Sequence, residues 1–267
     1  MKKLAIATAV LASLTASTAF AEVTVDVYGD RSTKGDNKST QGVEVGYGFD
    51  NGLGLSAEAT TNKDLDLGAS WKINYSESSY VKPSVNYVIN KSESLRAENH
   101  NPSNPDGFYE FAELTGLKSD VAKVGLEFGS QMGDFFSSAR IRYEVNVDKL
   151  SATREIGSIG ANGKLIPSET YSESVRSETA RIDLLVGYNF ENVTFTAKSI
   201  NKNELNKDMK NLNKEFGTKN DKWSGEFKAT VTAYDGVQPY IQYTHNKAFT
   251  KNGSDDQIIK IGTIFTF

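Results

Sequence analysis

One stretch decides the fold class of this chain: Ile258-Ile259-Lys260-Ile261-Gly262-Thr263-Ile264-Phe265-Thr266-Phe267. Alternate residues of a β-strand fall on opposite faces, so one face here carries Ile259, Ile261, Thr263, Phe265 and Phe267. The other face carries Lys260, Gly262 and Thr266. A soluble protein rarely leaves so apolar a strand face uncovered. We therefore expect lipid to cover it, as in a membrane-spanning β-barrel with aromatic residues at the membrane interface.

The same two-residue period recurs along the chain from Val23 onward. Apolar residues alternate with polar or charged ones, for example, from Val43 to Phe49 and from Ala139 to Val147. Turn sequences such as Asp50-Asn51-Gly52 and Asp235-Gly236 separate neighbouring strands. The pattern predicts an all-β fold, a transmembrane antiparallel β-barrel of twelve strands, with fourteen strands as the alternative. A soluble β-sandwich also alternates, but it does not explain the aromatic residues at the strand ends.

The predicted connections alternate between short and long, as a single-chain barrel with two different ends requires. We expect the long ones to be extracellular loops, above all at 90–118, 149–177 and 203–221. Residues 108–117 could begin another strand, but one more strand would place the turn at 130–134 on the wrong side. They are therefore assigned to an extracellular loop that can fold into the mouth. Within the third loop, the spacing of Leu205, Met209, Leu212 and Phe216 predicts a short amphipathic helix that caps the mouth.

The first residues have the order of a secretory signal peptide. Lys2 and Lys3 precede an apolar core from Leu4 to Leu14, and Ala19-Phe20-Ala21 forms an A-x-A cleavage site. The sequence thus predicts a cleaved signal peptide at 1–21 and a barrel at 22–267. The strand that closes on Phe267 resembles the end signal of bacterial outer-membrane barrels. This resemblance implies recognition by the barrel-assembly machinery and a place among outer-membrane lipid and lipopolysaccharide.

Composition excludes several classes of function. The chain has no cysteine and two histidines, which argues against disulfides and against thiolate or imidazole metal sites. Its net charge of −4 argues against nucleic-acid binding. We expect no cofactor and no metal.

The polar faces of the predicted strands should line the barrel interior, where a lumen of restricted bore is expected for twelve strands. The inward bases are Arg140, Arg142, Arg181, Lys198, Lys228, Lys72, Lys82, Lys123 and Lys260. The inward acids include Asp26, Glu44, Glu58, Asp66, Glu127, Glu144, Asp183 and Glu226. Acids dominate the first four strands and bases gain weight later, which predicts a field across the lumen.

Arg140, Arg142 and Arg181 point inward from two consecutive strands and can form one basic patch. One interpretation is a track for anionic solutes, because arginine forks match carboxylates. The other is that these arginines pair with Glu127, Glu144 or Asp183 and only keep the lumen hydrated.

The motif Arg-x-Arg-Tyr-Glu, from Arg140 to Glu144, together with the predicted signal peptide and strands, resembles the oligogalacturonate-specific porin family. The resemblance implies a small, monomeric, twelve-stranded channel that admits acidic oligosaccharides along basic lumen residues. The chain departs from that family in its first strand, which has Asp26 but no inward arginine.

The sequence therefore predicts an outer-membrane channel for passive diffusion of small hydrophilic solutes, and no catalytic residue. An outer-membrane phospholipase would need a serine two residues from a histidine, but Lys247 stands there beside His245. An omptin-like protease would need acids and a histidine at the mouth, which Asp255, Asp256 and His245 could imitate. A structural or adhesive barrel that acts through its long loops is the remaining alternative.

Overall fold

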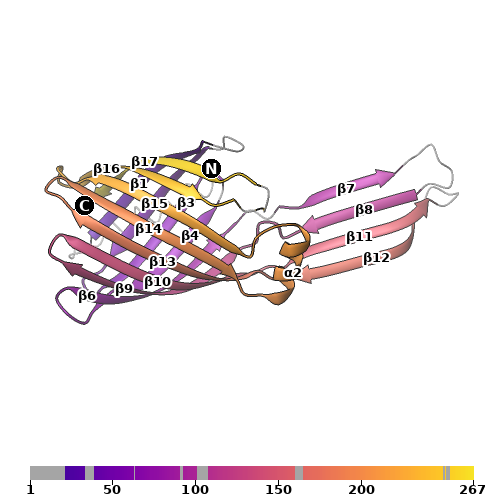
Figure 1. Ribbon diagram of the computed structural model, residues 1–267, viewed down its shortest axis with the longest axis horizontal. Coiled ribbons are helices and arrows are strands. Elements are labelled where there is room, and N and C mark those ends of the chain that lie inside the picture. Colours follow the sequence, from indigo (N-terminus) through magenta and orange to yellow (C-terminus); the bar gives the residue numbers. More distant parts are fainter. Residues whose placement is uncertain are drawn as a thin grey trace.

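A computed structural model describes residues 22–33, 39–62, 64–90, 93–100, 108–159, 165–248, 250 and 253–267. The predicted signal peptide at 1–21 lies outside these residues. Antiparallel strands surround a central axis, and a smaller sheet extends from one end (Figure 1). The principal sheet has the strand order β4-β3-β2-β1-β17-β16-β15-β14-β13-β10-β9-β6-β5, and β4 also pairs with β6.

The strands of the principal sheet follow the predicted alternation closely. Their bounds are β1 Glu22–Ser32, β2 Ser39–Gly48, β3 Leu53–Thr60, β4 Leu65–Trp71, β5 Ile73–Asn74, β6 Ser79–Ile89, β9 Val121–Met132, β10 Phe135–Asn146, β13 Glu178–Asn189, β14 Val193–Glu204, β15 Asp221–Val231, β16 Val237–Asn246 and β17 Asp256–Thr266.

Two seams close the sheet into a barrel. At the first, β1 pairs with β17, with Val25 opposite Phe265 and Tyr28 opposite Gly262. At the second, β4 pairs with β6 from Leu65 opposite Ile89 onward. The short β5 pairs only with the beginning of β6, so it extends β4 rather than adding a strand to the circle. The twelve-stranded barrel is thus confirmed, and the alternative of fourteen strands is wrong.

Large apolar side chains cover much of the outer surface. Ile141 is 62% exposed and Ile261 is 61% exposed, and aromatic residues such as Phe135 and Phe190 are also exposed near strand ends. A water-facing surface of this kind would be unfavourable by about 25 cal/mol per Å² of apolar area. The surface is instead suited to lipid, as the terminal strand predicts. No helix among the described residues is long and apolar enough to cross a membrane.

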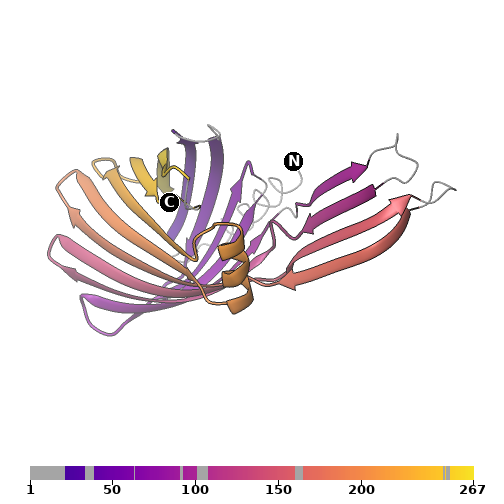
Figure 2. The ribbon, with the colours of Figure 1, turned by 45° about the vertical axis from the view of Figure 1, so that its right-hand side comes forward.

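The connections at 90–118 and 149–177, which the sequence predicts as extracellular loops, contain the strands of a second sheet, and their extracellular location stays a prediction. The strands of this sheet are β7 Leu95–His100, β8 Phe108–Thr115, β11 Leu150–Ile159 and β12 Leu165–Val175, in the order β12-β11-β8-β7. The alternation at 108–115 is real, but β8 pairs with β7 and β11 rather than with a barrel strand. The sheet projects away from the barrel instead of folding into the mouth (Figures 1 and 2).

The predicted helix in the connection after β14 is confirmed as α2, Lys207–Glu215. Asn206 caps its first turn by accepting hydrogen bonds from the backbone N–H groups of Asp208 and Met209. Figure 2 shows α2 at the end of the barrel from which the second sheet projects. Its proposed role as a cap over the mouth stays a prediction.

Three inward tyrosines lie across glycines of neighbouring strands. A Cβ atom on Gly42 would lie 2.2 Å from Cζ of Tyr28, and one on Gly129 would lie 2.2 Å from Cζ of Tyr80. Tyr240 crosses Gly262 in the same way. Each hydroxyl then donates to an acid: Tyr28 to Glu58, Tyr80 to Glu127 and Tyr240 to Asp26. The glycines are required because any side chain would displace the ring.

We expect Gly42→Ala to lower the free energy of unfolding by about 2 kcal/mol, because the new methyl group must push the Tyr28 ring aside. Urea unfolding of the barrel in lipid vesicles measures the change. The matched control is Gly29→Ala in the adjacent strand, where the nearest atom to the new Cβ is 4.0 Å away. Equal unfolding midpoints for the two variants would show that the ring has free room to move.

Candidate functional site

The charged side chains of the barrel gather on its concave inner face. Several of them reach across an intervening strand, which side chains on a concave surface can do because they converge. Lys123 on β9 donates to Asp66 on β4 at 2.7 Å across β6, and Tyr240 on β16 reaches Asp26 on β1 across β17. The inner wall is therefore one connected polar surface.

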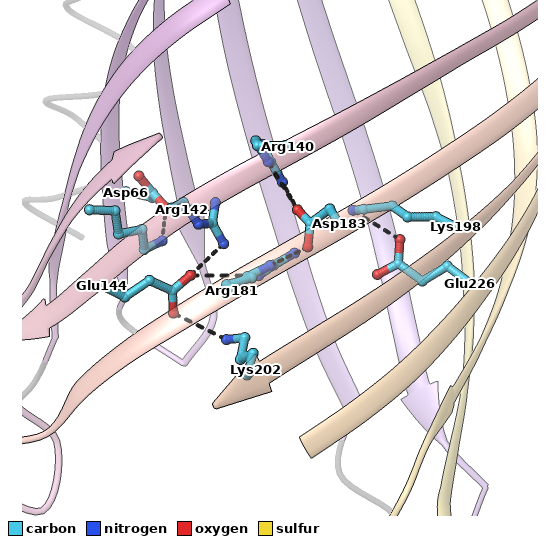
Figure 3. A network of polar contacts seen from close by, with 10 residues as sticks. Asp66, Arg140, Arg142, Glu144, Arg181, Asp183, Lys198, Lys202 and Glu226 are labelled. Atoms are coloured by element: carbon cyan, nitrogen blue, oxygen red, sulfur yellow. Dashed lines mark hydrogen bonds and ion pairs between the residues drawn. The ribbon is translucent and has the colours of Figure 1, made fainter. Parts of the chain in front are cut away.

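Two of the predicted arginines share one carboxylate. Arg140 donates through Nε to Asp183 at 2.9 Å and also through Nη2, and Arg181 donates through Nε to the other oxygen at 2.6 Å. Arg140 and Asp183 are directly opposite in the register of β10 and β13. The side chain of Asp183 is only 4% exposed. This carboxylate thus joins the two strands and neutralises much of the local positive charge (Figure 3).

A second carboxylate, Glu144, collects three cations. It lies 2.6 Å from Arg142, 3.3 Å from Lys202 and 3.8 Å from Arg181 (Figure 3). The strand register shows why a carboxylate is needed beside these cations. One row of bases crosses four neighbouring strands, at Arg142, Arg181, Lys202 and Lys222. Like charges in directly opposite positions destabilise a sheet. Glu144 offsets this repulsion from one residue pair away.

The other predicted bases also have partners. Ion pairs join Lys198 to Glu226 at 3.2 Å and Lys82 to Glu127 at 3.4 Å. Three lysines lie over tyrosine rings, at distances from nitrogen to ring centre of 3.7 Å for Lys228 and Tyr240, 3.6 Å for Lys260 and Tyr28, and 4.9 Å for Lys72 and Tyr80. Such contacts hold a cation at a defined place on the wall. Arg140, Arg142 and Arg181 therefore pair with Asp183 and Glu144, as one of the two interpretations of the sequence expects. The other interpretation, a track for anionic solutes, stays a prediction.

The opposite part of the wall carries a row of acids. Asp26, Glu44, Glu58 and Asp66 face one another in register across β1, β2, β3 and β4. Tyr240 donates to Asp26, Tyr28 donates to Glu58, and Asp66 receives both Lys123 and Asn86. Glu44, in the middle of the row, is exposed and has no hydrogen bond or ion pair within the described chain.

The predicted list missed several residues of this wall. Lys202 and Lys222 belong to the basic row, and Tyr28, Tyr80 and Tyr240 hold acids and lysines in place. Lys202 could have been found by continuing the alternation of Val193 to Ala197 outward to Glu204, where β14 ends. Lys222 could have been found by extending the alternation of Ser224 and Glu226 back toward Asp221, where β15 begins. The tyrosine positions have a weaker signal, since only the opposing glycines mark them.

A separate polar cluster lies where β16 ends and β17 begins. His245 Nε2 is 3.1 Å from Asp255 Oδ2, and Lys247 is 3.7 Å from the same oxygen. The backbone N–H of Ala248 donates to Asp255 at 2.9 Å and, as the largest favourable contact, lowers the pKa of this carboxyl. No serine or threonine hydroxyl among the described residues bonds to His245, so the cluster lacks a nucleophile. No group of three or more potential metal ligands occurs in these ranges either.

Comparisons with known proteins support the fold. No protein-family model and no curated protein matches the sequence. Among solved structures, the NanC porin aligns with a TM-score of 0.62 and 16% identity over 90% of this chain and 98% of its own. The KdgM porin in complex with disordered oligogalacturonate aligns with a TM-score of 0.54 and 10% identity over 91% of this chain and 99% of its own. At these identities the similarity shows a shared barrel architecture.

We expect Asp183→Asn to lower the free energy of unfolding by about 3 kcal/mol, since Arg140 and Arg181 would lose their common counter-charge on a buried part of the wall. Urea unfolding in lipid vesicles measures the loss. The control is Glu226→Gln, whose ion pair with Lys198 is more exposed and should contribute less than about 1 kcal/mol. A loss for Asp183→Asn no larger than that of the control would mean that lumen water replaces the carboxylate.

Proposed function

We propose that this protein is an outer-membrane channel for the passive diffusion of small hydrophilic solutes. The observation that carries the proposal is the combination of an apolar outer surface with a charged inner wall in one closed barrel. A lipid-facing exterior places the protein in a membrane, and a polar interior offers solutes a path that lipid does not. Diffusion down a gradient requires no catalytic residue.

The size of the barrel supports a narrow passage. Eight-stranded barrels are filled by their own side chains, whereas barrels of sixteen or more strands hold wide aqueous channels. Twelve strands lie between these limits. Inside this barrel, two cavities of about 440 and 450 Å³ are lined mainly by polar and charged side chains. These volumes suit solutes of one or two sugar or amino-acid units.

Acidic oligosaccharides are the more specific candidate. The structurally similar KdgM porin was solved with oligogalacturonate, and the part of this wall from β9 to β15 carries more bases than acids. The ion pairs of Arg140, Arg142 and Arg181 reduce the attraction that such a solute would feel.

The second candidate function is that of a structural or adhesive barrel. The projecting sheet of β7, β8, β11 and β12 favours it.

The proposal includes the route to the membrane. Residues 1–21 would direct export and be removed, and the barrel-assembly machinery would recognise the strand ending at Phe267. The folded chain would work as a monomer among lipid and lipopolysaccharide. Mass spectrometry of the protein from outer membranes, with Glu22 expected as the first residue, tests the cleavage.

Single-channel current in a planar bilayer tests the channel directly. We expect discrete openings from purified, refolded protein. A silent bilayer, with folding confirmed by heat-modifiable gel mobility, would exclude the channel and favour an adhesive role for the projecting sheet.

Replacing Arg140, Arg142 and Arg181 together with serine should shift the reversal potential in a salt gradient toward cation preference. The change removes three positive charges from the wall and leaves Asp183 and Glu144 without their main partners. The matched control removes three positive charges from α2 through Lys207→Ser, Lys210→Ser and Lys214→Ser. At about 0.1 M salt the control should shift the potential less, because solvent screens these lysines over about 10 Å. Equal potentials for all three proteins would show that the arginines are structural only.

A further inference from the structure

One of the lumen cavities brings opposite charges to its two sides. The cavity of about 450 Å³ is bordered by Glu22 on β1 and Glu44 on β2 and, from β6 and β10, by Lys82 and Arg140. Its wall also includes Glu127, which is already engaged by Lys82 and by the hydroxyl of Tyr80. A solute in this space would therefore meet carboxylates on one side and cationic groups on the other.

Glu44 differs from the other members of the acid row because no residue in the described part of the chain holds it by a hydrogen bond or ion pair. Asp26 and Glu58 accept tyrosine hydroxyls, and Asp66 is paired with Lys123. Glu44 stands between Asp26 and Glu58 in register, is exposed, and makes no hydrogen bond or ion pair with any residue described in the structure. Its charge is thus available to a solute, and the neighbouring acids strengthen the negative potential there.

The cationic side keeps donors that the wall does not use. Arg140 directs Nε and Nη2 to Asp183, while Nη1 has no hydrogen-bond partner among the described residues. The side chain of Arg140 is 25% exposed, compared with 10% for Arg142. Lys82 is 35% exposed and has a single ion-pair contact at 3.4 Å. These two groups can therefore donate to a carboxylate in the cavity.

The space between the two sides exists because the strands between them carry small residues. Gly54, Ser56, Gly68, Ser70 and Ser84 all border the cavity. A Cβ atom on Gly68 would lie 2.5 Å from the hydroxyl oxygen of Ser56, so this part of the wall is already closely packed. The charged groups consequently face each other over a wall of short side chains.

We infer that the lumen favours small zwitterions, such as free dipeptides, over anions and cations of the same size. This inference rests on the proposed channel function. The ammonium group of a zwitterion would face Glu44 while its carboxylate receives hydrogen bonds from Arg140 and Lys82. An anion meets the same donors but is repelled by the acid row, and a cation has the opposite difficulty. One favourable charge pair at about 7 Å in water changes a rate by about threefold.

Solute uptake into proteoliposomes tests the inference. The probes are diglycine as zwitterion, N-acetylglycine as anion, glycinamide as cation and arabinose as neutral reference. The membrane potential is held at zero with potassium and valinomycin, and leakage into protein-free vesicles is subtracted. We expect diglycine, relative to arabinose, to enter about three times faster than either singly charged probe.

Variants connect the preference to the named residues. Glu44→Gln should lower the uptake of diglycine relative to arabinose about threefold, because it removes one charge pair without changing the bore. Glu44→Lys should make N-acetylglycine the fastest charged probe. The control, Asp235→Asn, removes an acid from the turn between β15 and β16 and should change neither rate. Heat-modifiable gel mobility shows that each variant has folded into an intact barrel.

The outcomes separate the two levels of the proposal. If arabinose enters but the three charged probes enter equally fast, or N-acetylglycine is fastest in the unaltered protein, the zwitterion inference is overturned while the channel stands. If diglycine is fastest but Glu44→Gln has no effect, the assignment to this cavity is overturned. If arabinose does not enter, the channel itself is excluded, and the inference fails with it.

Discussion

The structure depends on the complete pairing of the backbone in a closed sheet. In lipid, an unpaired N–H or C=O group costs several kcal/mol, so a strand can cross only when both of its edges are bonded. The pairing of β1 with β17 meets this requirement, because it gives both terminal strands of the barrel a bonded neighbour on each side. Once the ring is closed, alternation leaves no freedom. Residues such as Ile261 must face lipid, and residues such as Lys260 must face the interior.

Many charged residues face the interior of the barrel, so repulsion between like charges on the inner wall must be offset. Rows of like charge meet in register, with Arg142 opposite Arg181 and Glu44 opposite both Asp26 and Glu58. The basic row is balanced by Asp183 and Glu144, which come from positions one pair away. The acidic row is held mainly by tyrosine hydroxyls, which donate a hydrogen bond but bring no positive charge. The two sides of the lumen therefore keep opposite character even though most groups on each side have partners.

Much of this architecture could be predicted from the sequence, because the physical rule involved is local. The period of two assigns each residue of a strand to a face, and turn residues such as Asn51-Gly52 mark where strands end. The stretch 108–115 shows the limit of that rule. Its alternation is that of a strand, but alternation does not say which neighbour completes the pairing, and β11 proved to be the partner.

The sequence could indicate which residues line the candidate site, but it could not predict which of them contact one another. Arg140 had three acids within plausible reach in the sequence. The register places it directly opposite both Asp183 on β13 and Glu127 on β9, and in the folded barrel it bonds to Asp183. That register is set by the stagger of the whole barrel, which no short segment encodes. The role of Tyr240 was hidden for the same reason, since Asp26 lies more than 200 residues away along the chain and becomes its neighbour only when the ring closes.

The crossings of tyrosine over glycine also bear on how the barrel reaches its correct alignment. A slip of one residue between β1 and β2 would turn apolar side chains inward and charged ones toward lipid, which is energetically unfavourable. A slip of two residues preserves the inside and the outside, so hydrophobicity cannot detect it. It would, however, place Tyr28 against Glu44 or Thr40 instead of Gly42. The side chains of Glu44 and Thr40 would leave the tyrosine ring no room to lie across the strand, as it does over Gly42. The glycines thus favour the native register sterically over slipped registers that keep the same residues inside and outside.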